Sequence, residues 1–258
     1  MTTKKTSMIP LVTLTLRDIK RFLRIWTQSL IPPMLTSILF ILIFGYSLGS
    51  RISEVEGVSY LNFILPGLLM MGVIMSAYMA SSFALFIQKF QRSIEELLVA
   101  PIAYWQIIAG TTIAAMLRSF MVGLGILLVS ILLTPISVHN IWILLTFIIL
   151  ISMLFSFAGI ATALWAKNFD QMNIFSTFMI TPLTYLGGVF YSIKMLPQPW
   201  TTIAKFNPIL YMIDGFRYGF IGVSDIPLVY SFAVVISLTL FFFGLCVWMF
   251  KSGYKLRT

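Results

Sequence analysis

The chain has 258 residues, of which 59% are hydrophobic and only 10% are charged. A soluble protein carries about a quarter charged residues, so this composition excludes a surface that faces water and indicates an integral membrane protein. The net charge of +9 is divided among short segments beside apolar runs. That distribution is typical of membrane orientation signals, and we expect lipid rather than nucleic acid around this chain.

Six apolar runs are each long enough to cross a bilayer as a helix, which takes about 20 residues. Five of them contain no charged residue, and the third contains Arg118. The sequence therefore predicts an all-α domain over residues 30–250, preceded by a cytoplasmic region 1–29 and followed by a cytoplasmic tail 251–258. The six predicted spans are 30–50, 61–87, 107–133, 141–166, 172–191 and 228–250.

Lysine and arginine residues predict the orientation, because membrane proteins keep an excess of them on the cytoplasmic side. With a cytoplasmic N-terminus, twelve of the seventeen fall on that side, four fall on the other, and Arg118 lies in the membrane. We therefore predict that both termini are cytoplasmic. A charge inside the membrane is a candidate functional residue, although snorkelling or burial against serine and threonine side chains would also explain it.

Residues 9–26 carry apolar and basic side chains on opposite faces of a helix. Such basic amphipathic helices lie in the headgroup plane of a membrane, with tryptophan at the boundary. We predict an interfacial helix here; a plain positive-inside anchor is the alternative. The apolar face consists of Val12, Leu16, Ile19, Leu23 and Trp26, and the polar face of Thr13, Arg17, Lys20 and Arg24.

The predicted cytoplasmic loop 88–106 contains a signal for a short helix. Ser93 and Glu96 have the spacing of a capping box, and Pro101 prevents the helix from continuing far. We predict a helix of about two turns across the cytoplasmic surface, the alternative being a stiff loop resting on lipid. Its apolar face would consist of Ile94, Leu97 and Leu98 and would be available to anchor a partner. Glu95 and Glu96 would give it a local negative charge on an otherwise positive surface.

The external segment 192–227 is far longer than a connection between two antiparallel helices needs. Pro208 suits the first turn of a helix, and the apolar stretch that follows it to Ile221 is too short to span. Within it, Asp214 and Arg217 are three positions apart and can pair on one face. We predict a re-entrant or interfacial helix that contains a partly buried ion pair.

No catalytic, metal-binding or nucleotide-binding motif stands out. No glycine is followed by lysine, so a phosphate-binding Walker loop is absent, and His139 and Cys246 have no metal-ligand neighbours at the usual spacing. The run Gly45–Gly49 fits a serine-hydrolase pattern only outside its required context. Like Gly215–Gly219, it also fits the G-x-x-x-G pattern of close helix contact, which is a weak signal in a chain with 16 glycines.

Three motifs, in order, resemble the permease subunits of ABC-2 type exporters, including enterobacterial inner-membrane permeases of that family. Leu65-Pro66-Gly67 opens the second span, Glu95-Glu96-Leu97-Leu98-Val99-Ala100-Pro101 lies in the cytoplasmic loop, and Asn207-Pro208 precedes Arg217 before the last span. The resemblance covers nearly the whole chain. It implies a type V exporter-like fold in the bacterial inner membrane, and a homodimer on two copies of an ABC ATPase subunit.

The same resemblance implies roles for the three charged elements. The stretch ending at Trp26 would be the family's interfacial helix, Ser93–Pro101 its coupling helix, and 197–221 its external re-entrant helices. ATP and magnesium would be bound by the partner, so this chain would be no enzyme and would carry no cofactor or metal. The substrate would be a hydrophobic, amphipathic or glycan-type molecule moved outward.

Three other functions remain open from the residues themselves. A secondary transporter driven by an ion gradient is the first, but such proteins place acidic or histidine residues in the membrane, and the six predicted spans contain none. A membrane-embedded enzyme is disfavoured by the missing catalytic constellation. A structural or assembly protein is the third alternative.

The predicted topology can be tested by single-cysteine labelling. In a Cys246→Ala background, Lys194→Cys should react with a membrane-impermeant maleimide added from outside, because the lysine and arginine count places residues 192–227 on the external side. Labelling of this position only from the cytoplasmic side would contradict the orientation.

Overall fold

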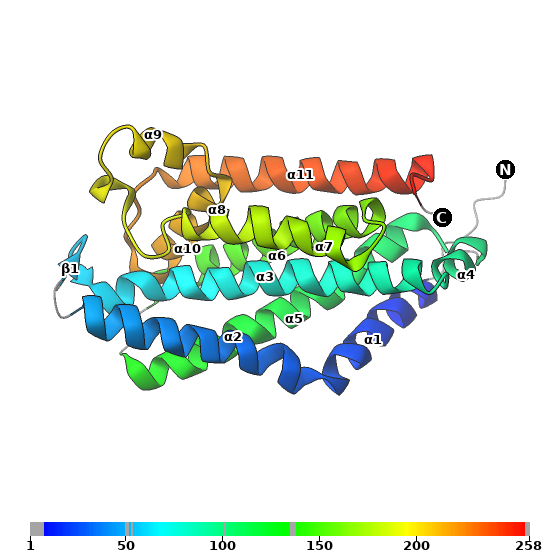
Figure 1. Cartoon of the computed structure of the whole chain (residues 1–258), viewed down its shortest axis with the longest axis horizontal. Coiled ribbons are helices and arrows are strands. Elements are labelled where there is room, and N and C mark those ends of the chain that lie inside the picture. The colour runs from blue at the N-terminus through cyan, green and yellow to red at the C-terminus, as the bar shows by residue number, and fades with distance from the viewer. Residues whose placement is uncertain (1–7, 50–51, 53, 101, 135–137, 256–258) are drawn as a thin grey trace.

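The computed structural model of the chain describes residues 8–49, 52, 54–100, 102–134 and 138–255. Long helices run side by side along its longest axis (Figure 1). Within the described residues, five helical stretches are long and apolar enough to cross a membrane. They confirm five of the predicted spans: α2 (Trp26–Phe40) with the π-helical stretch η1 (Ile41–Leu48), α3 (Tyr60–Phe90), α5 (Tyr104–Leu133), α6 (Ile141–Trp165) and α11 (Leu228–Ser252).

The remaining predicted span, 172–191, is a shorter and irregular helix. It consists of α7 (Phe169–Phe175), the π-helical stretch η2 (Ser176–Ile180) and α8 (Thr181–Tyr185) without a break between them. At about 1.5 Å per residue these 17 residues reach about 25 Å, slightly less than the hydrocarbon core. The predicted end at residue 191 is wrong, because the chain turns after Tyr185 and Gly188 adopts a positive φ of 78°.

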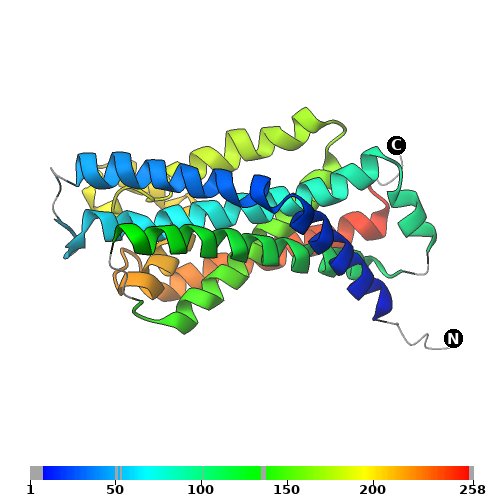
Figure 2. The ribbon, with the colours of Figure 1, turned by 90° about the horizontal axis from the view of Figure 1, so that it is seen from below.

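The first predicted helix also ends earlier than its sequence pattern indicates. α1 (Ile9–Arg24) stops at Ile25, whose φ of −121° and ψ of 30° are not helical, and Trp26 opens α2 instead. Figure 2 shows α1 leaving the bundle at an angle. The first span therefore begins four residues before the predicted Leu30, and its predicted end at residue 50 lies outside the described residues.

α3 forms the centre of the bundle. It packs against both α5 and α6, and most of its side chains are buried; the less buried ones, such as Met71, Met75, Met79 and Phe83, recur every four residues on one face. The Pro66-Gly67 pair lies in this buried part. A Cβ atom on Gly67 would lie 2.8 Å from the Val189 Cα, so glycine allows the chain beyond α8 to approach the helix backbone.

The two ends of the bundle carry different elements. One end holds a two-stranded antiparallel hairpin, β1 (Glu54–Val55) and β2 (Val58–Ser59), together with η3 (Ile193–Met195), α9 (Trp200–Lys205) and α10 (Pro208–Ile221). The other end holds α4 (Ile94–Val99), the start of α1 and the end of α11 (Figure 1). This arrangement agrees with the predicted separation of the 88–106 loop from the 192–227 segment; the side of the membrane stays a prediction.

α10 packs unusually closely on α6. A Cβ atom on Gly215 would collide with the ring of Phe147, and one on Gly219 would lie 2.8 Å from the backbone nitrogen of Leu144. The backbone nitrogen of Asn140 donates to the Gly219 carbonyl at 2.8 Å, which ties the start of α6 to the end of α10. The G-x-x-x-G pattern at Gly215–Gly219, weak as a sequence signal, therefore marks a real close contact.

Alanine substitutions test this contact. Gly215→Ala should destabilise the protein by about 1–3 kcal/mol, because the added methyl overpacks a buried site. Gly244→Ala is the matched control in the long helix α11, since no atom of the described residues lies within 4 Å of the place its methyl group would take. This control should be neutral or slightly stabilising. The apparent melting temperatures of the purified variants measure the difference; equal values for the two variants would contradict the packing.

Candidate functional site

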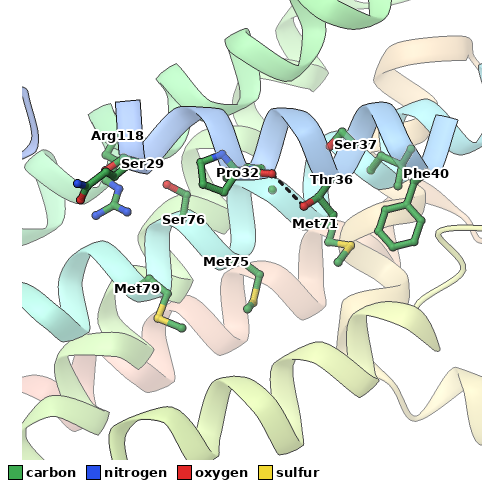
Figure 3. Close-up of a pocket in the computed structure, with 14 residues that line it drawn as sticks. Ser29, Pro32, Thr36, Ser37, Phe40, Met71, Met75, Ser76, Met79 and Arg118 are labelled. Carbon is green, nitrogen blue, oxygen red and sulfur yellow. Dashed lines mark hydrogen bonds between the residues drawn. The ribbon is translucent and has the colours of Figure 1, made fainter. Parts of the chain in front are cut away.

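A cavity of about 370 Å³ lies between α2 and α3, with Arg118 of α5 at one end (Figure 3). Its volume falls within the range of small-molecule sites, about 300–1,000 Å³. The end nearest the α1–α2 junction is polar and is lined by Gln28, Ser29, Ser76 and Arg118. The opposite end, toward the hairpin, is lined by Phe40 together with Thr36 and Ser37 (Figure 3). The cavity therefore combines a charged end at Arg118 with apolar and hydroxyl side chains along the rest of its length.

α2 contributes a face that is partly polar although the helix lies in lipid. Pro32 and Pro33 are inside the helix and both line the cavity. Proline has no backbone N–H, so these two residues remove the helical partners of the Gln28 and Ser29 carbonyls. The hydroxyl of Thr36 donates to the Pro32 carbonyl at 2.9 Å, shown as a dashed line in Figure 3. The prolines therefore place backbone acceptors at the polar end of the cavity.

α3 contributes a row of methionines and one unpartnered hydroxyl. Met71, Met75 and Met79 are four residues apart and line the cavity together. Methionine is flexible and polarisable, and it adapts to apolar ligands of different shape. Ser76 lies on the same wall; it is 7% exposed, and its Oγ has no hydrogen-bond partner among the described residues. The wall therefore combines an adaptable apolar surface with a polar atom that lacks a partner.

Arg118 lies between this cavity and a second one of about 40 Å³ against α1. Its guanidinium carbon is 5.8 Å from the ring centroid of Phe22, and its Nε has no hydrogen-bond partner in the described part of the chain. Asp18 also lines the smaller cavity, but its carboxylate pairs with Arg17 at 3.3 Å and with Arg21 at 3.7 Å. Within the described residues, no carboxylate forms an ion pair with Arg118.

Aromatic side chains gather beyond the Phe40 end of the cavity. Phe40 of α2 contacts Phe190 and Tyr185, with ring centroids 5.4 and 6.3 Å apart, and Phe44 stacks on Phe190 at 4.6 Å. This cluster joins the first span to the chain that follows α8. The first span contains the π-helical stretch η1, and the 169–185 helix contains the π-helical stretch η2. π-helical stretches are frequently found at functional sites.

The predicted apolar and polar faces of α1 are largely exposed, and the helix packs on the bundle through a third face. Arg17, Lys20, Arg24 and Trp26 are exposed, as are Val12, Leu16 and Leu23 of the apolar face. The helix rests on α5 through Leu14, Asp18 and Phe22 instead. The exposed apolar face thus remains available to lipid. Sequence reasoning missed Asp18, because an acidic residue in a basic segment resembles an ordinary solvated charge.

α4 is shorter than predicted, and its apolar face points inward. It begins at Ile94, directly after Ser93, whose hydroxyl donates to the Gln88 carbonyl at 3.2 Å. Ile94 is 1% exposed and packs on Leu85 and other core residues of this chain, so the prediction that it anchors a partner is wrong. The face left open consists of Glu95 and Val99, the latter 87% exposed.

Three further parts of the coupling-helix prediction cannot be placed. Pro101 and the side chains of Glu96 and Leu98 lie outside the described residues, whereas Leu97 is half-buried against the same inner core. The capping box and the local negative charge therefore stay predictions.

Lys89 has a structural role that its charge alone did not indicate. Its ammonium group is buried and donates to the carbonyls of Leu164 and Ala166 at 2.6 and 2.8 Å. These carbonyls belong to the last turn of α6, whose helical acceptors have no partner within the helix. Lys89, one of the twelve basic residues counted as cytoplasmic, thus donates hydrogen bonds to the carbonyl groups at the end of a helix. No spacing in the sequence reveals this long-range contact.

In the external element, Asp214 and Arg217 are both 1% exposed, deeper than the predicted partly buried pair. Their nearest charged atoms are 3.9 Å apart, which makes the direct ion pair long. Asp214 instead accepts hydrogen bonds from the backbone nitrogens of Asp225 and Ile226 at 2.8 and 3.1 Å. Each charge therefore relies more on backbone partners than on the other charge.

Arg217 crosses from α10 to the turn after α8. It donates through Nη2 to the Gly188 carbonyl, and its guanidinium carbon lies 4.0 Å from the ring centroid of Phe63. Pro208 occupies the first position of α10 as predicted, and the side chain of Asn207 caps it by accepting from the Ile209 nitrogen at 3.0 Å.

A charged cluster holds the external surface around this element. The Ser192 hydroxyl and the Ile193 backbone nitrogen donate to the Asp225 carboxylate at 2.8 and 2.9 Å. Lys194 donates to Glu56 of the hairpin at 2.9 Å and lies 3.6 Å from Asp225. The hydrogen bond to Glu56 raises the pKa of Lys194 above its ordinary value, so this lysine stays charged.

Comparisons with known proteins agree with the resemblance noted in the sequence. Residues 10–221 match the family model described as ABC-2 type transporter. The chain is 45% identical to the inner membrane transport permease YadH of Escherichia coli K12 over 243 residues, 94% of each chain. It is 25% identical over 199 residues, 75% of each chain, to nodulation protein J of Rhizobium leguminosarum bv. viciae. Nodulation protein J of Rhizobium meliloti is 27% identical over 175 residues, 67% of this chain and 66% of that one.

The buried charges of α10 can be tested by neutral substitutions. Arg217→Gln and Asp214→Asn should each cost about 3 kcal/mol or more, because each weakens charge-assisted hydrogen bonds to buried backbone groups and leaves the other buried charge without an opposite charge beside it. The double variant should recover part of that loss, since it leaves neither charge alone. Lys205→Gln, at the exposed end of α9, is the control. Thermal unfolding of the four variants measures the effect, and wild-type stability in both single variants would contradict a buried role.

Proposed function

The chain belongs to the ABC-2 type transporter family, and we propose that it is the membrane subunit of an ATP-driven exporter whose ATPase is a separate protein. The family match spans most of the chain, and the relative with 45% identity is named an inner membrane transport permease. These names and the apolar helices support a multi-pass permease of the inner membrane. The observation that carries the proposal is the family match together with the cavity between α2 and α3, which has both polar and apolar lining residues.

We count six spans in this function, with α7, η2 and α8 together as the fifth. The stretch is helical from residue 169 to 185, and local thinning of the bilayer accommodates a slightly short helix. Six spans return the C-terminus to the side of the N-terminus, consistent with the common end that holds the start of α1 and the end of α11. The positive charge bias supports a cytoplasmic location for that end.

A separate ATPase as the energy source is part of the proposal. The 258 residues contain no phosphate-binding loop, and the loops between the predicted spans are too short for a nucleotide-binding domain. ATP and magnesium are then bound by two copies of a partner ATPase. The partner must contact the permease at the cytoplasmic end, where α4 presents Glu95 and Val99. A carboxylate on a basic surface can select a partner and set its register.

Homodimerisation is the arrangement that the family resemblance implies, and we include it in the proposal. The first span lines the cavity, and both this span and the 169–185 helix expose apolar side chains such as Leu35, Leu39 and Phe178. A second copy placed along these helices would enclose the cavity from the lipid side. The substrate would then move between the subunits, from the α1 end toward the aromatic cluster.

The runner-up is a secondary transporter driven by an ion gradient. Proton and ion relays in membranes use aspartate, glutamate or histidine, and the predicted spans contain none. Asp214 is the deepest acidic residue near the bundle among those described, but two backbone N–H groups and Arg217 hold it. A carboxylate held in this way is suited to a structural role.

The coupling role of α4 is tested by charge reversal. We expect Glu95→Lys/Glu96→Lys to insert and fold normally but to lose its ATPase on co-purification from the native membrane, or to retain it with transport uncoupled from hydrolysis. Asp170→Lys is the matched control: an exposed acidic residue in the first turn of α7, at the same end of the bundle.

Two results would count against the proposal. A charge-reversed permease that retains its ATPase and transports at the wild-type rate would remove α4 from the mechanism. A tagged wild-type permease that captures no ATPase, measured as ATP hydrolysis in the purified sample and by mass spectrometry, would contradict the exporter itself.

A further inference from the structure

We propose that Arg118 and Ser76 bind the anionic group of an amphiphile whose apolar part lies along the methionines of α3. The inference rests on the proposed function, because a permease needs a site for what it moves, and it names the substrate class of that site. The cavity between α2 and α3 supplies both halves of such a ligand's surroundings: a polar end at Arg118 and an apolar wall (Figure 3).

The charge of Arg118 is the first observation. Residue 118 lies 14 positions after the start of α5, about 21 Å along a helix of about 45 Å, and Asp18 and Arg21 of α1 line the small cavity beside it. A charged side chain inside a membrane span is costly unless it finds a partner. In the part of the chain that the structure describes, its contacts are a ring face at 5.8 Å and no carboxylate. An anion in the cavity would supply the missing partner.

The carboxylate of Asp18 forms no ion pair with Arg118. Asp18 lines the neighbouring small cavity; Arg17 and Arg21 pair with its Oδ1, whereas its Oδ2 is buried and has no hydrogen-bond partner among the described residues. These two arginines and Arg118 carry three positive charges against the single negative charge of Asp18. The local excess of positive charge therefore favours an incoming anion. A guanidinium group presents its donors in a planar fork, which matches carboxylate and phosphate groups.

Ser76 is an independent second observation. Its side chain is more than nine-tenths buried, its hydroxyl has no partner among the described residues, and it lines the same cavity. Figure 3 places it on α3 beside Met75, on the side of Arg118. Buried hydroxyl groups without a partner are rare, because each loses its hydrogen bonds to water. A bound oxyanion would accept a hydrogen bond from this hydroxyl and from Arg118 together.

The rest of the cavity fits an apolar chain. Met71, Met75 and Met79 form one wall, and Phe40 closes the far end. The polar end lies next to the α1–α2 junction at Ile25, so a molecule leaving the headgroup plane along α1 meets Gln28 and Arg118 first. Arg118 lies near the middle of α5 and lines both cavities, so the anionic group would bind at the end of the larger cavity nearest α1.

The inference is tested with cis-parinaric acid, a fluorescent fatty acid, and its uncharged methyl ester. Full-length permease, with its ATPase wherever the two co-purify, is placed in phosphatidylcholine nanodiscs without ATP, and empty nanodiscs give the background. Saturable binding of the acid should weaken at least tenfold in Arg118→Gln and about threefold in Ser76→Ala, while the ester binds weakly to all. Arg24→Gln, an exposed arginine of α1, is the matched control and should bind like the wild type.

Two further variants protect the test against misfolding of Arg118→Gln. Arg118→Lys keeps the charge without the fork and should give intermediate affinity for the acid. Met75→Trp fills the apolar wall and should abolish acid binding with every charge in place. The proposal is wrong if a folded Arg118→Gln, with wild-type melting temperature and elution volume, binds the acid as tightly as the wild type. It is equally wrong if the ester binds as tightly as the acid.

The source of the anion is resolved by adding phosphatidylglycerol to the nanodiscs. Loss of probe binding would assign the site to an anionic membrane lipid, and unchanged binding would assign it to a free amphiphile; both outcomes support the anion site. Because the assay uses no ATP, it is independent of the exporter proposal. Probe binding by a permease that captures no ATPase would support this site and refute the exporter proposal. Capture of an ATPase by a permease that does not bind the probe would support the exporter proposal and refute this site.

Discussion

Lipid cannot hydrogen-bond to a peptide group, and the structure of this protein depends on that constraint. Helices satisfy their own backbone, but every place where a helix ends or the chain turns leaves N–H and C=O groups without partners. The buried charges at the two ends of the bundle are found at such places. Lys89 donates to the last carbonyls of α6, Asp214 accepts from the backbone after α10, and Arg217 donates to the turn after α8. Charges that would be costly in lipid alone therefore compensate for an irregular backbone.

Close helix contact depends on the same constraint. α10 is too short to cross the membrane, so it must be enclosed by other helices, and Gly215 and Gly219 allow it to lie directly against α6. The charges then fix the loops on both sides of it: Arg217 reaches the turn at Gly188, and Asp214 orients the backbone at Asp225. Asp225 in turn accepts a hydrogen bond from the Ser192 hydroxyl and lies 3.6 Å from the ammonium group of Lys194. One short helix thus organises the end of the bundle that carries the hairpin.

At the cavity between α2 and α3, backbone groups lose hydrogen-bond partners instead of gaining them. Pro32 and Pro33 leave carbonyl groups without helical partners, and they do so beside Arg118 and Ser76, which also have polar atoms without partners among the described residues. Unsatisfied polar groups are expected where a ligand binds rather than in a structural core. Lys89 and Asp214 satisfy backbone groups at the helix ends, whereas Ser76 and Arg118 keep polar atoms without partners beside one cavity. Buried polar atoms without partners also occur elsewhere in the described residues, at Asp18, Gln88 and Arg217 among others.

The sequence by itself determined the membrane class, five long helices, the separation of the 88–106 loop from the 192–227 segment, and the family resemblance. These follow from apolar length, charge placement and local motifs such as Pro208 after Asn207, which act over a few residues. Tertiary structure alone decided the end of the 172–191 helix, the inward face of Ile94, and the partners of Lys89, Asp214 and Arg217. It also decided that Ser76 and Arg118, 42 residues apart, line one cavity. The physical reason is that lipid selects helices by composition alone, whereas which side chain meets which backbone group depends on how the helices pack.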